Sequence, residues 1–209
     1  VDPKNENRLY TIFSEVNKSE DGGKSFQNLL PYDGVHPDHH AWWIHPTDPS
    51  FIINGNDGGI AISRDRGRTW QFDEKLPLGQ FYHINVDNEI PYNVMGGLQD
   101  NGSWHGPAYV WADGGIRNSY WKAVGGGDGF DVIPDPQDSK WVYSMSQGGA
   151  LGRQNTATGE RWSIRPPSPD PNVRIRFNWN AAFGQDNFDP NTIYYGSQFV
   201  HKSTNKGAA

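Results

Sequence analysis

The sequence contains no cysteine, which excludes disulfide bonds and thiolate metal sites. It also lacks any run of about 18 apolar residues, the minimum for a membrane-spanning helix. Basic residues are in the minority, because 18 Lys and Arg face 24 Asp and Glu and leave a formal net charge of -6. Nucleic-acid binding depends on a basic surface that neutralises phosphates, so this balance argues against a nucleic-acid partner.

Hydrophobic residues make up only 34% of the chain, yet aromatic residues reach 13%. Nine Trp, nine Tyr and ten Phe therefore supply much of the apolar area available for a core. The 25 Gly and 15 Pro indicate many tight turns, and no segment shows a convincing helical period. This composition predicts an all-β protein built from short strands.

A repeat of about 45 residues runs through the chain. Five proline-containing turns recur at spacings of 46, 42, 45 and 54 residues, and an apolar run of β type follows each. The turns are Asp2-Pro3, Asp48-Pro49, Ile90-Pro91, Asp135-Pro136 and Asp189-Pro190. Several short strands in a repeat of this length are typical of propeller blades.

The second repeat shows its strands most clearly. Four of them are expected, at residues 41–45, 51–54, 59–63 and 69–72, and the first strands of later repeats are expected at 81–86, 129–133 and 177–183. In the third repeat an insertion from about His105 to Ser119 interrupts the pattern, and its Tyr109 and Trp111 make it a candidate contact loop.

The repeats predict one partial β-propeller domain over residues 1–209, made of four-stranded antiparallel blades. The approximate blades are 1–30, 31–73, 74–124, 125–165 and 166–209, of which three are complete and two partial. Because a propeller closes its ring to protect its sheet edges, we expect the remaining blades to belong to the same, longer chain.

Two turns match the pattern Ser-x-Asp-x-Gly-x-Ser/Thr-aromatic, and their aspartates are 44 residues apart. In such a turn the Asp accepts backbone N–H groups, the Gly takes a positive φ and the aromatic ring packs between sheets. A third copy begins at Ser203 and has Asn205 in place of Asp. Because the pattern repeats from blade to blade, we interpret its residues as structural. They are Ser19, Asp21, Gly23, Phe26, Ser63, Asp65, Gly67 and Trp70.

These turns and three further segments, 38–43, 96–104 and 125–130, resemble the BNR/Asp-box repeat proteins of bacteria. That family is similar to the luminal propeller of sortilin and to propeller glycoside hydrolases of the xyloglucanase type. The resemblance implies a secreted, periplasmic or extracellular propeller that acts as a protein- or glycan-binding module. It does not imply one activity, so a glycoside hydrolase and a structural subunit of a larger assembly stay open as alternatives.

Alternate connections of a four-stranded antiparallel blade lie at opposite ends of the sheet. The turns between second and third strands should therefore share one end with the blade-to-blade loops, and this end is the predicted binding site. The residues expected to contact a glycan or a protein or peptide ligand are Trp42, Tyr82, Gln99, Asn101 and Trp104.

The same end gathers acidic and imidazole side chains. Glycoside hydrolysis needs two carboxyl groups about 5–10 Å apart, and Asp57, Asp100 and Asp128 are the candidate catalytic residues, with Asp131 also in the pool. The alternative is that these Asp residues close Gly-rich turns. On an extended strand His36, Asp38 and His40 would share one face, which makes them a candidate divalent-metal site, although no cofactor is required. Their alternative role is a hydrogen-bonded polar rim.

Overall fold

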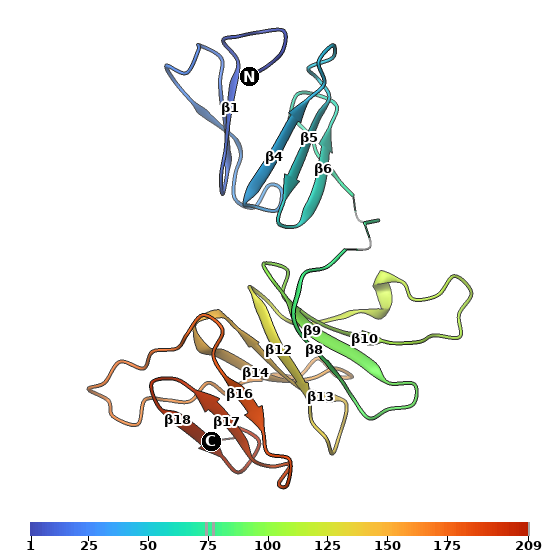
Figure 1. Cartoon of the computed structure of the whole chain (residues 1–209), viewed down its shortest axis with the longest axis vertical. Helices are drawn as coiled ribbons and strands as arrows, with labels where there is room; N and C mark the ends of the chain where they lie inside the picture. The colour runs from blue at the N-terminus through green and yellow to red at the C-terminus, as the bar shows by residue number, and fades with distance from the viewer. Residues whose placement is uncertain (74, 77, 209) are drawn as a thin grey trace. The chain divides into compact units, whose positions relative to one another are not determined.

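The computed structural model describes residues 1–73, 75–76 and 78–208. They form two compact units, Val1–Leu78 and Gly79–Ala209, and each unit is described here by itself. Both are all-β, and together they hold five antiparallel sheets of three or four strands (Figure 1). No helix among the described residues is long and apolar enough to cross a membrane.

The first unit contains two sheets whose strands follow one another in chain order. The first sheet consists of β1 (Leu9–Ile12), β2 (Val16–Ser19) and β3 (Gln27–Leu30), and the second of β4 (His39–Ile44), β5 (Ile52–Asn56), β6 (Gly59–Ser63) and β7 (Gln71–Phe72). Tyr10, Trp42 and Trp70 pack at tilted angles, with ring centroids 5.2 and 5.3 Å apart. These partly buried rings add to a core whose buried hydrophobic residues are Val16, Leu30, Ile52 and Ala61.

The second unit contains three sheets with the same up-and-down order. They are β8 (Phe81–Val86), β9 (Asn93–Leu98), β10 (Ser103–Pro107) and β11 (Lys122–Gly125); β12 (Gly129–Pro134), β13 (Trp141–Ser146), β14 (Ala150–Asn155) and β15 (Arg161–Ser163); and β16 (Phe183–Gln185), β17 (Ile193–Gly196) and β18 (Val200–Ser203). Two short 3-10 helices, Asn118–Tyr120 and Gln147–Gly149, lie in its connections.

The sheets of the second unit pack face to face through two small cores. Met95, Val124, Val132 and Val142 form the one that involves the first two sheets of this unit. The other one lies further along the chain and contains Phe130, Met145, Leu151, Ala181 and Tyr195. The contact between β9 and β12 is closest at Gly97, where an added Cβ would lie 2.0 Å from the carbonyl carbon of Gly129. Successive meandering sheets packed in this way form a partial β-propeller, as the sequence predicts.

One end of every sheet is closed by hydrogen bonds between its two turns. In the second and fourth sheets the turn between third and fourth strands donates a backbone N–H to the turn between first and second strands, from Arg66 to Ser50 and from Thr156 to Lys140. In the three-stranded first sheet Gly22, between β2 and β3, donates to Asn7, which precedes β1. In the three-stranded fifth sheet Lys206, which follows β18, donates to Asn191 between β16 and β17. In the third sheet Ala108 donates to Tyr92 at the corresponding place. We call this end the turn end. It has the same architecture in all five sheets.

The matched Ser-x-Asp turns lie at the turn end and are closed by their own side chains. Asp65 accepts the backbone N–H of Thr69 at 2.8 Å and its hydroxyl at 2.7 Å, while the Ser63 hydroxyl donates to Asp65 and accepts the N–H of Gly67. Arg66 and Gly67 have φ values of 63° and 85°. The backbone N–H and hydroxyl of Thr69 hold the pKa of Asp65 down at about 2.

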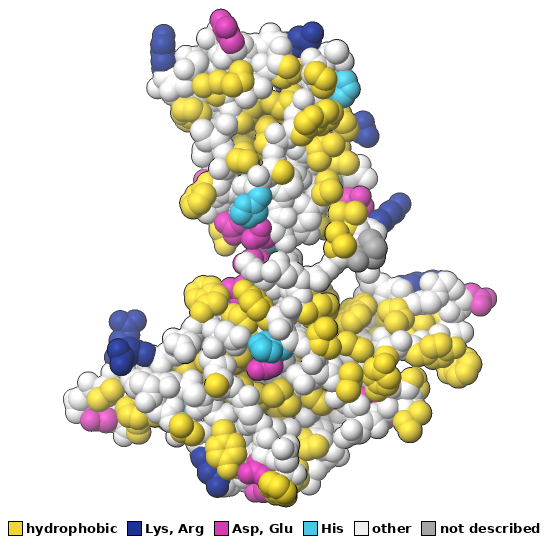
Figure 2. Space-filling model, viewed as in Figure 1, with side chains coloured by type: hydrophobic (Ala, Val, Ile, Leu, Met, Phe, Trp, Pro, Cys, Tyr) yellow, Lys and Arg dark blue, Asp and Glu magenta, His cyan; other side chains and the backbone are white. Residues whose placement is uncertain are grey.

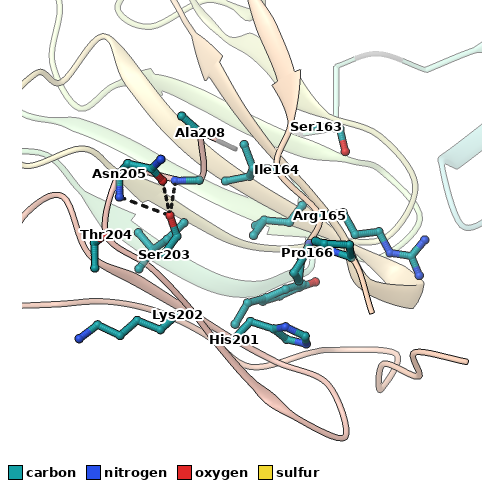
Figure 3. Close-up of a pocket in the computed structure, with 15 residues that line it drawn as sticks. Ser163, Ile164, Arg165, Pro166, His201, Lys202, Ser203, Thr204, Asn205 and Ala208 are labelled. Atoms are coloured by element: carbon teal, nitrogen blue, oxygen red, sulfur yellow. Dashed lines mark hydrogen bonds between the residues drawn. The ribbon is translucent and has the colours of Figure 1, made fainter. Parts of the chain in front are cut away.

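The third copy of this turn repeats the contacts of the serine, with Asn205 in the place of Asp. The Ser203 hydroxyl donates to Asn205 Oδ1 at 2.7 Å and accepts the N–H of Gly207 at 3.0 Å (Figure 3). An amide oxygen can therefore replace one carboxylate oxygen in this turn. Figure 3 also shows Ile164 facing this turn, where a Cβ at Gly207 would lie 2.8 Å from the Ile164 side chain.

Several predictions are wrong in their bounds. The strand expected at 69–72, for example, spans only Gln71–Phe72. The first strand of the fifth sheet is Phe183–Gln185 and not 177–183, because the preceding segment is held as a loop by Gln198, whose N–H donates to Arg176. The Phe177 ring packs on Tyr195 at 5.2 Å instead of standing on a strand. His105 lies inside β10, so the insertion begins after Pro107.

Candidate ligand-binding rim

The opposite end of the second unit is formed by the turns 99–102 and 147–149 and the loops 126–128 and 174–182, which we call the rim. Asp128 lies at its centre and is only 5% exposed. One carboxylate oxygen accepts the backbone N–H of Asp100 at 2.8 Å, and the other accepts Trp179 Nε1–H at 2.8 Å. The backbone N–H of Asp128 in turn donates to Gln147 Oε1 at 2.9 Å. One buried carboxylate thus connects rim segments that belong to three sheets.

Trp179 is the residue of the rim that presents the largest aromatic surface. Its side chain is 61% exposed although its indole N–H is fixed by Asp128. A buried carboxylate that orients an exposed ring leaves the ring face free while restricting its rotation. The sequence pattern did not identify Trp179, because it assigned the residue to a strand at 177–183, whereas the residue lies in the loop before β16.

The predicted ligand-contacting residues of the third sheet also lie on or beside the rim. Tyr82 is 40% exposed, and its ring packs against Phe130 at 4.7 Å. Gln99 Oε1 accepts from Gln80 Nε2, Asn101 donates through Nδ2 to the carbonyl of Gln99, and Trp104 donates through Nε1 to the carbonyl of Asn101 at 2.7 Å. The structure therefore brings Tyr82, Gln99, Asn101 and Trp104 into one neighbourhood with Asp100 and Asp128.

A second polar group lies on the first strands beside the rim. His83 in β8 and Asp131 in β12 approach to 3.7 Å between Nδ1 and Oδ1, and Asn180 Nδ2 lies 3.2 Å from His83 Nε2. Burial raises the pKa of the Asp131 carboxyl, and the nearby His83 partly offsets this rise. His83 and Asp131 each lie two residues after the start of a first strand, and only Asp131 was among the residues predicted from the sequence.

The remaining predicted residues belong to the first unit. His40 Nε2 pairs with Asp57 Oδ1 at 2.8 Å. Trp42 lies in the aromatic cluster of the first unit, and that placement is structural. The suggestion that Asp57 shares a catalytic site with Asp100 and Asp128 stays a prediction.

The strand argument for a metal site at His36, Asp38 and His40 is wrong. Strand β4 begins only at His39, and Asp38 has a φ of 59°, which breaks the alternation that would align the three side chains. His36 packs on Gly58, where an added Cβ would lie 2.6 Å from its ring. His39 itself is buried and contacts Asn54. Metal binding by these residues remains an untested prediction, and the shared strand face that supported it is absent.

The candidate contact loop of the third sheet is at the other end of the molecule's second unit. Trp111 is 88% exposed and meets Tyr109 edge to face, with centroids 5.1 Å apart. The loop leaves β10 beside Tyr92, which belongs to the turn end. Trp111 is thus an exposed indole well separated in the fold from the rim.

No protein-family model and no curated protein matches the sequence. Among solved structures, the chain is similar to a GH74 enzyme from Niastella koreensis, at 18% identity and a TM-score of 0.41, over 100% of this chain and 36% of that one. A GH74 xyloglucanase from Xanthomonas campestris matches at 15% identity and a TM-score of 0.40, over 99% of this chain and 36% of that one. YCF48 bound to D1 peptide matches at 14% identity and a TM-score of 0.36, over 97% of this chain and 63% of that one.

The chain spans about a third of the length of the two GH74 proteins and less than two thirds of YCF48. At low sequence identity, it is a propeller module that resembles parts of these BNR/Asp-box-type propeller structures.

Proposed function

We propose that this chain is a glycan-binding propeller module of a secreted, periplasmic or extracellular protein, and that its ligand stacks on Trp179. The observation that carries the proposal is an indole that is 61% exposed while Asp128 holds its N–H at 2.8 Å. Rigid, amphipathic aromatic rings supply contact area at a low entropic cost. A sugar ring, with its apolar face and its equatorial hydroxyls, fits such a platform.

The polar groups beside the platform support the same conclusion. Asn180 follows Trp179 directly in the loop, and it reaches His83, whose side chain is 45% exposed. Asp131 adds a carboxyl on the neighbouring strand. Amide, imidazole and carboxyl groups offer both donors and acceptors to sugar hydroxyls.

The proposal is tested by binding of the full chain to an array of neutral and acidic polysaccharides, with a peptide array as the competing arm. Trp179→Ala should weaken glycan binding about 10- to 30-fold, the loss associated with an aromatic hot spot of up to about 2 kcal/mol. Trp111→Ala, which removes an even more exposed indole at the turn end, is the matched control and should bind normally. Thermal unfolding of both variants verifies that each is folded.

Two results contradict the proposal. Binding to peptides with no glycan bound would reject the ligand class, and glycan binding that survives Trp179→Ala would reject the site.

A glycoside hydrolase is the second candidate, and the raised pKa of Asp131 favours it. A partly buried carboxyl whose pKa is raised by burial is better suited to act as a general acid than an exposed one. Asp128 fits a positioning role better, because both of its oxygens are engaged. Release of reducing ends from the bound polysaccharides, abolished in Asp131→Asn or Asp100→Asn, would establish hydrolysis. Binding without any release of reducing ends would reject it.

A further inference from the structure

Positive charge is concentrated in one stretch of an otherwise acidic chain. Residues 153–176 contain five arginines but only Glu160 and Asp170 as acids, whereas the whole chain has a net charge of -6. Figure 2 shows basic side chains gathered at one edge of the 79–209 unit. A local surplus of arginine on an acidic protein needs an explanation beyond solubility.

A cavity of about 560 Å³ on the fourth sheet receives part of this charge. Arg161, Ser163 and Arg165 line it, and as alternate residues along the last strand and its extension they lie on one face. Ser144, Ser146 and Gln147 contribute further polar side chains to the lining. A Cβ at Gly152 would lie 3.3 Å from Arg161 Nε, so the missing side chain on β14 leaves room for this guanidinium.

Neither Arg161 nor Arg165 forms an ion pair with any residue that the structure describes. Arg153, on the neighbouring strand, shows the contrast, since it is paired with the buried Asp135 at 3.0 Å. Arg165 lies instead over the Phe177 ring, 5.0 Å from its centroid, which orients the guanidinium without neutralising it. Ser163 and Arg165 also line the adjoining cavity of about 420 Å³ shown in Figure 3.

We propose that the 560 Å³ cavity binds the carboxylate groups of an acidic polysaccharide, a uronic-acid polymer, through Arg161 and Arg165. A guanidinium matches a carboxylate with two parallel N–H donors, and serine hydroxyls beside it suit sugar hydroxyls. The inference rests on the proposed glycan binding at Trp179. Gln147 connects the two places, because it lines the cavity and accepts the N–H of Asp128, which holds Trp179.

The test compares two polymers that differ only in charge. Polygalacturonate and its methyl-esterified form are titrated into the full chain by calorimetry, at 50 and 300 mM NaCl. The acidic polymer should bind at least about 10-fold more tightly at low salt, and the preference should shrink at high salt because exposed charges are screened. The double variant Arg161→Gln/Arg165→Gln should remove the preference while leaving binding of the ester unchanged.

Arg64→Gln is the matched control, because Arg64 likewise lies over an aromatic ring, Phe51, at 4.8 Å but belongs to the other unit. It should keep the preference. If the double variant does not fold, Arg161→Gln alone, at an exposed position, should reduce the preference by about half on a logarithmic scale.

Three results would overturn the inference. Equal affinity for the two polymers, or binding of neither, rejects the carboxylate site, and a preference that survives in the double variant rejects these arginines. Competition by sodium sulfate without any preference between the polymers shows an adventitious ion only. Failure of the proposed function looks different, because Trp179→Ala would then leave binding of the esterified polymer intact.

Discussion

The turn end and the rim use aspartate in opposite ways. At the turn end Asp65 accepts hydrogen bonds from Ser63 and Thr69, which are two and four residues away. At the rim Asp128 accepts from Asp100 and Trp179, which are 28 and 51 residues away. The first arrangement closes one turn and recurs along the chain, whereas the second connects different sheets. Asp135 at the turn end also connects two sheets, but it does so through the ammonium group of Lys206 at 2.7 Å. Asp128 differs from both, because it accepts from a backbone N–H and from an exposed indole beside the candidate site.

The largest effect is expected near the rim, where the backbones of two sheets are in direct contact. Gly97→Ala would place a methyl group 2.0 Å from the Gly129 carbonyl carbon, so β9 and β12 would have to separate. We expect a loss of more than about 3 kcal/mol in the free energy of unfolding, measured by urea titration. Gly184→Ala in β16 is the control, because nothing lies within 4 Å of the added methyl group. Equal stability of the two variants would show that the sheets are not packed as described.

Removal of the rim carboxylate should have the next largest effect. Asp128→Ala removes the acceptor of the partly buried N–H of Asp100 and of the indole N–H of Trp179, at an expected cost of about 2–4 kcal/mol. The same change should free the Trp179 ring and weaken glycan binding. Urea unfolding and the quenching of tryptophan fluorescence measure the two effects. A variant that binds normally and unfolds as the parent does would remove the connecting role of Asp128.

The sequence predicted the all-β fold and placed most strands, because turn chemistry and strand alternation act over a few residues. The alignment of the repeats on their proline turns was less accurate. The first position of the equivalent turn is occupied in successive sheets by Asp2, His45, Asp87, Asp135 and Asp186, each donating its N–H across the turn. The Asp-Pro pairs fall on two different positions of this turn: Asp2 occupies the first position, whereas Asp48 accepts from Phe51 three residues further along. This shift of three residues adds to the uneven spacing of the proline turns, and the equivalent turns are themselves unevenly spaced.

The candidate site was less accessible to sequence reasoning. Asp128 stood out because of its Gly-rich surroundings, but its partners Asp100 and Trp179 lie on other sheets, and no local pattern pairs residues that far apart. His83 and Asn180 were missed for the same reason, since their contact joins positions 97 residues apart. The strand assumed for His36, Asp38 and His40 was wrong, because Asp38 has a positive φ, and metal binding by these residues stays an untested prediction.

The smallest expected effect belongs to the turn end and appears only in acid. The hydroxyl and N–H of Ser25 hold the pKa of Asp21 at about 2, and Thr69 does the same for Asp65, against an ordinary value of 3.8. Because both pKa values are lowered in the folded state, the stability they contribute is present above about pH 4 and is lost as the pH falls toward 2. Asp21→Asn/Asp65→Asn should therefore flatten the decline of the unfolding temperature between pH 4 and 2 while lowering that temperature slightly at pH 7. Asp128→Asn, whose effect is a lost acceptor between sheets, should lower the unfolding temperature by a larger amount at pH 7. If the unfolding temperature of the double variant falls as steeply between pH 4 and 2, the charge of these aspartates does not stabilise the turns. The third copy of the turn already has a neutral residue, Asn205, at this position.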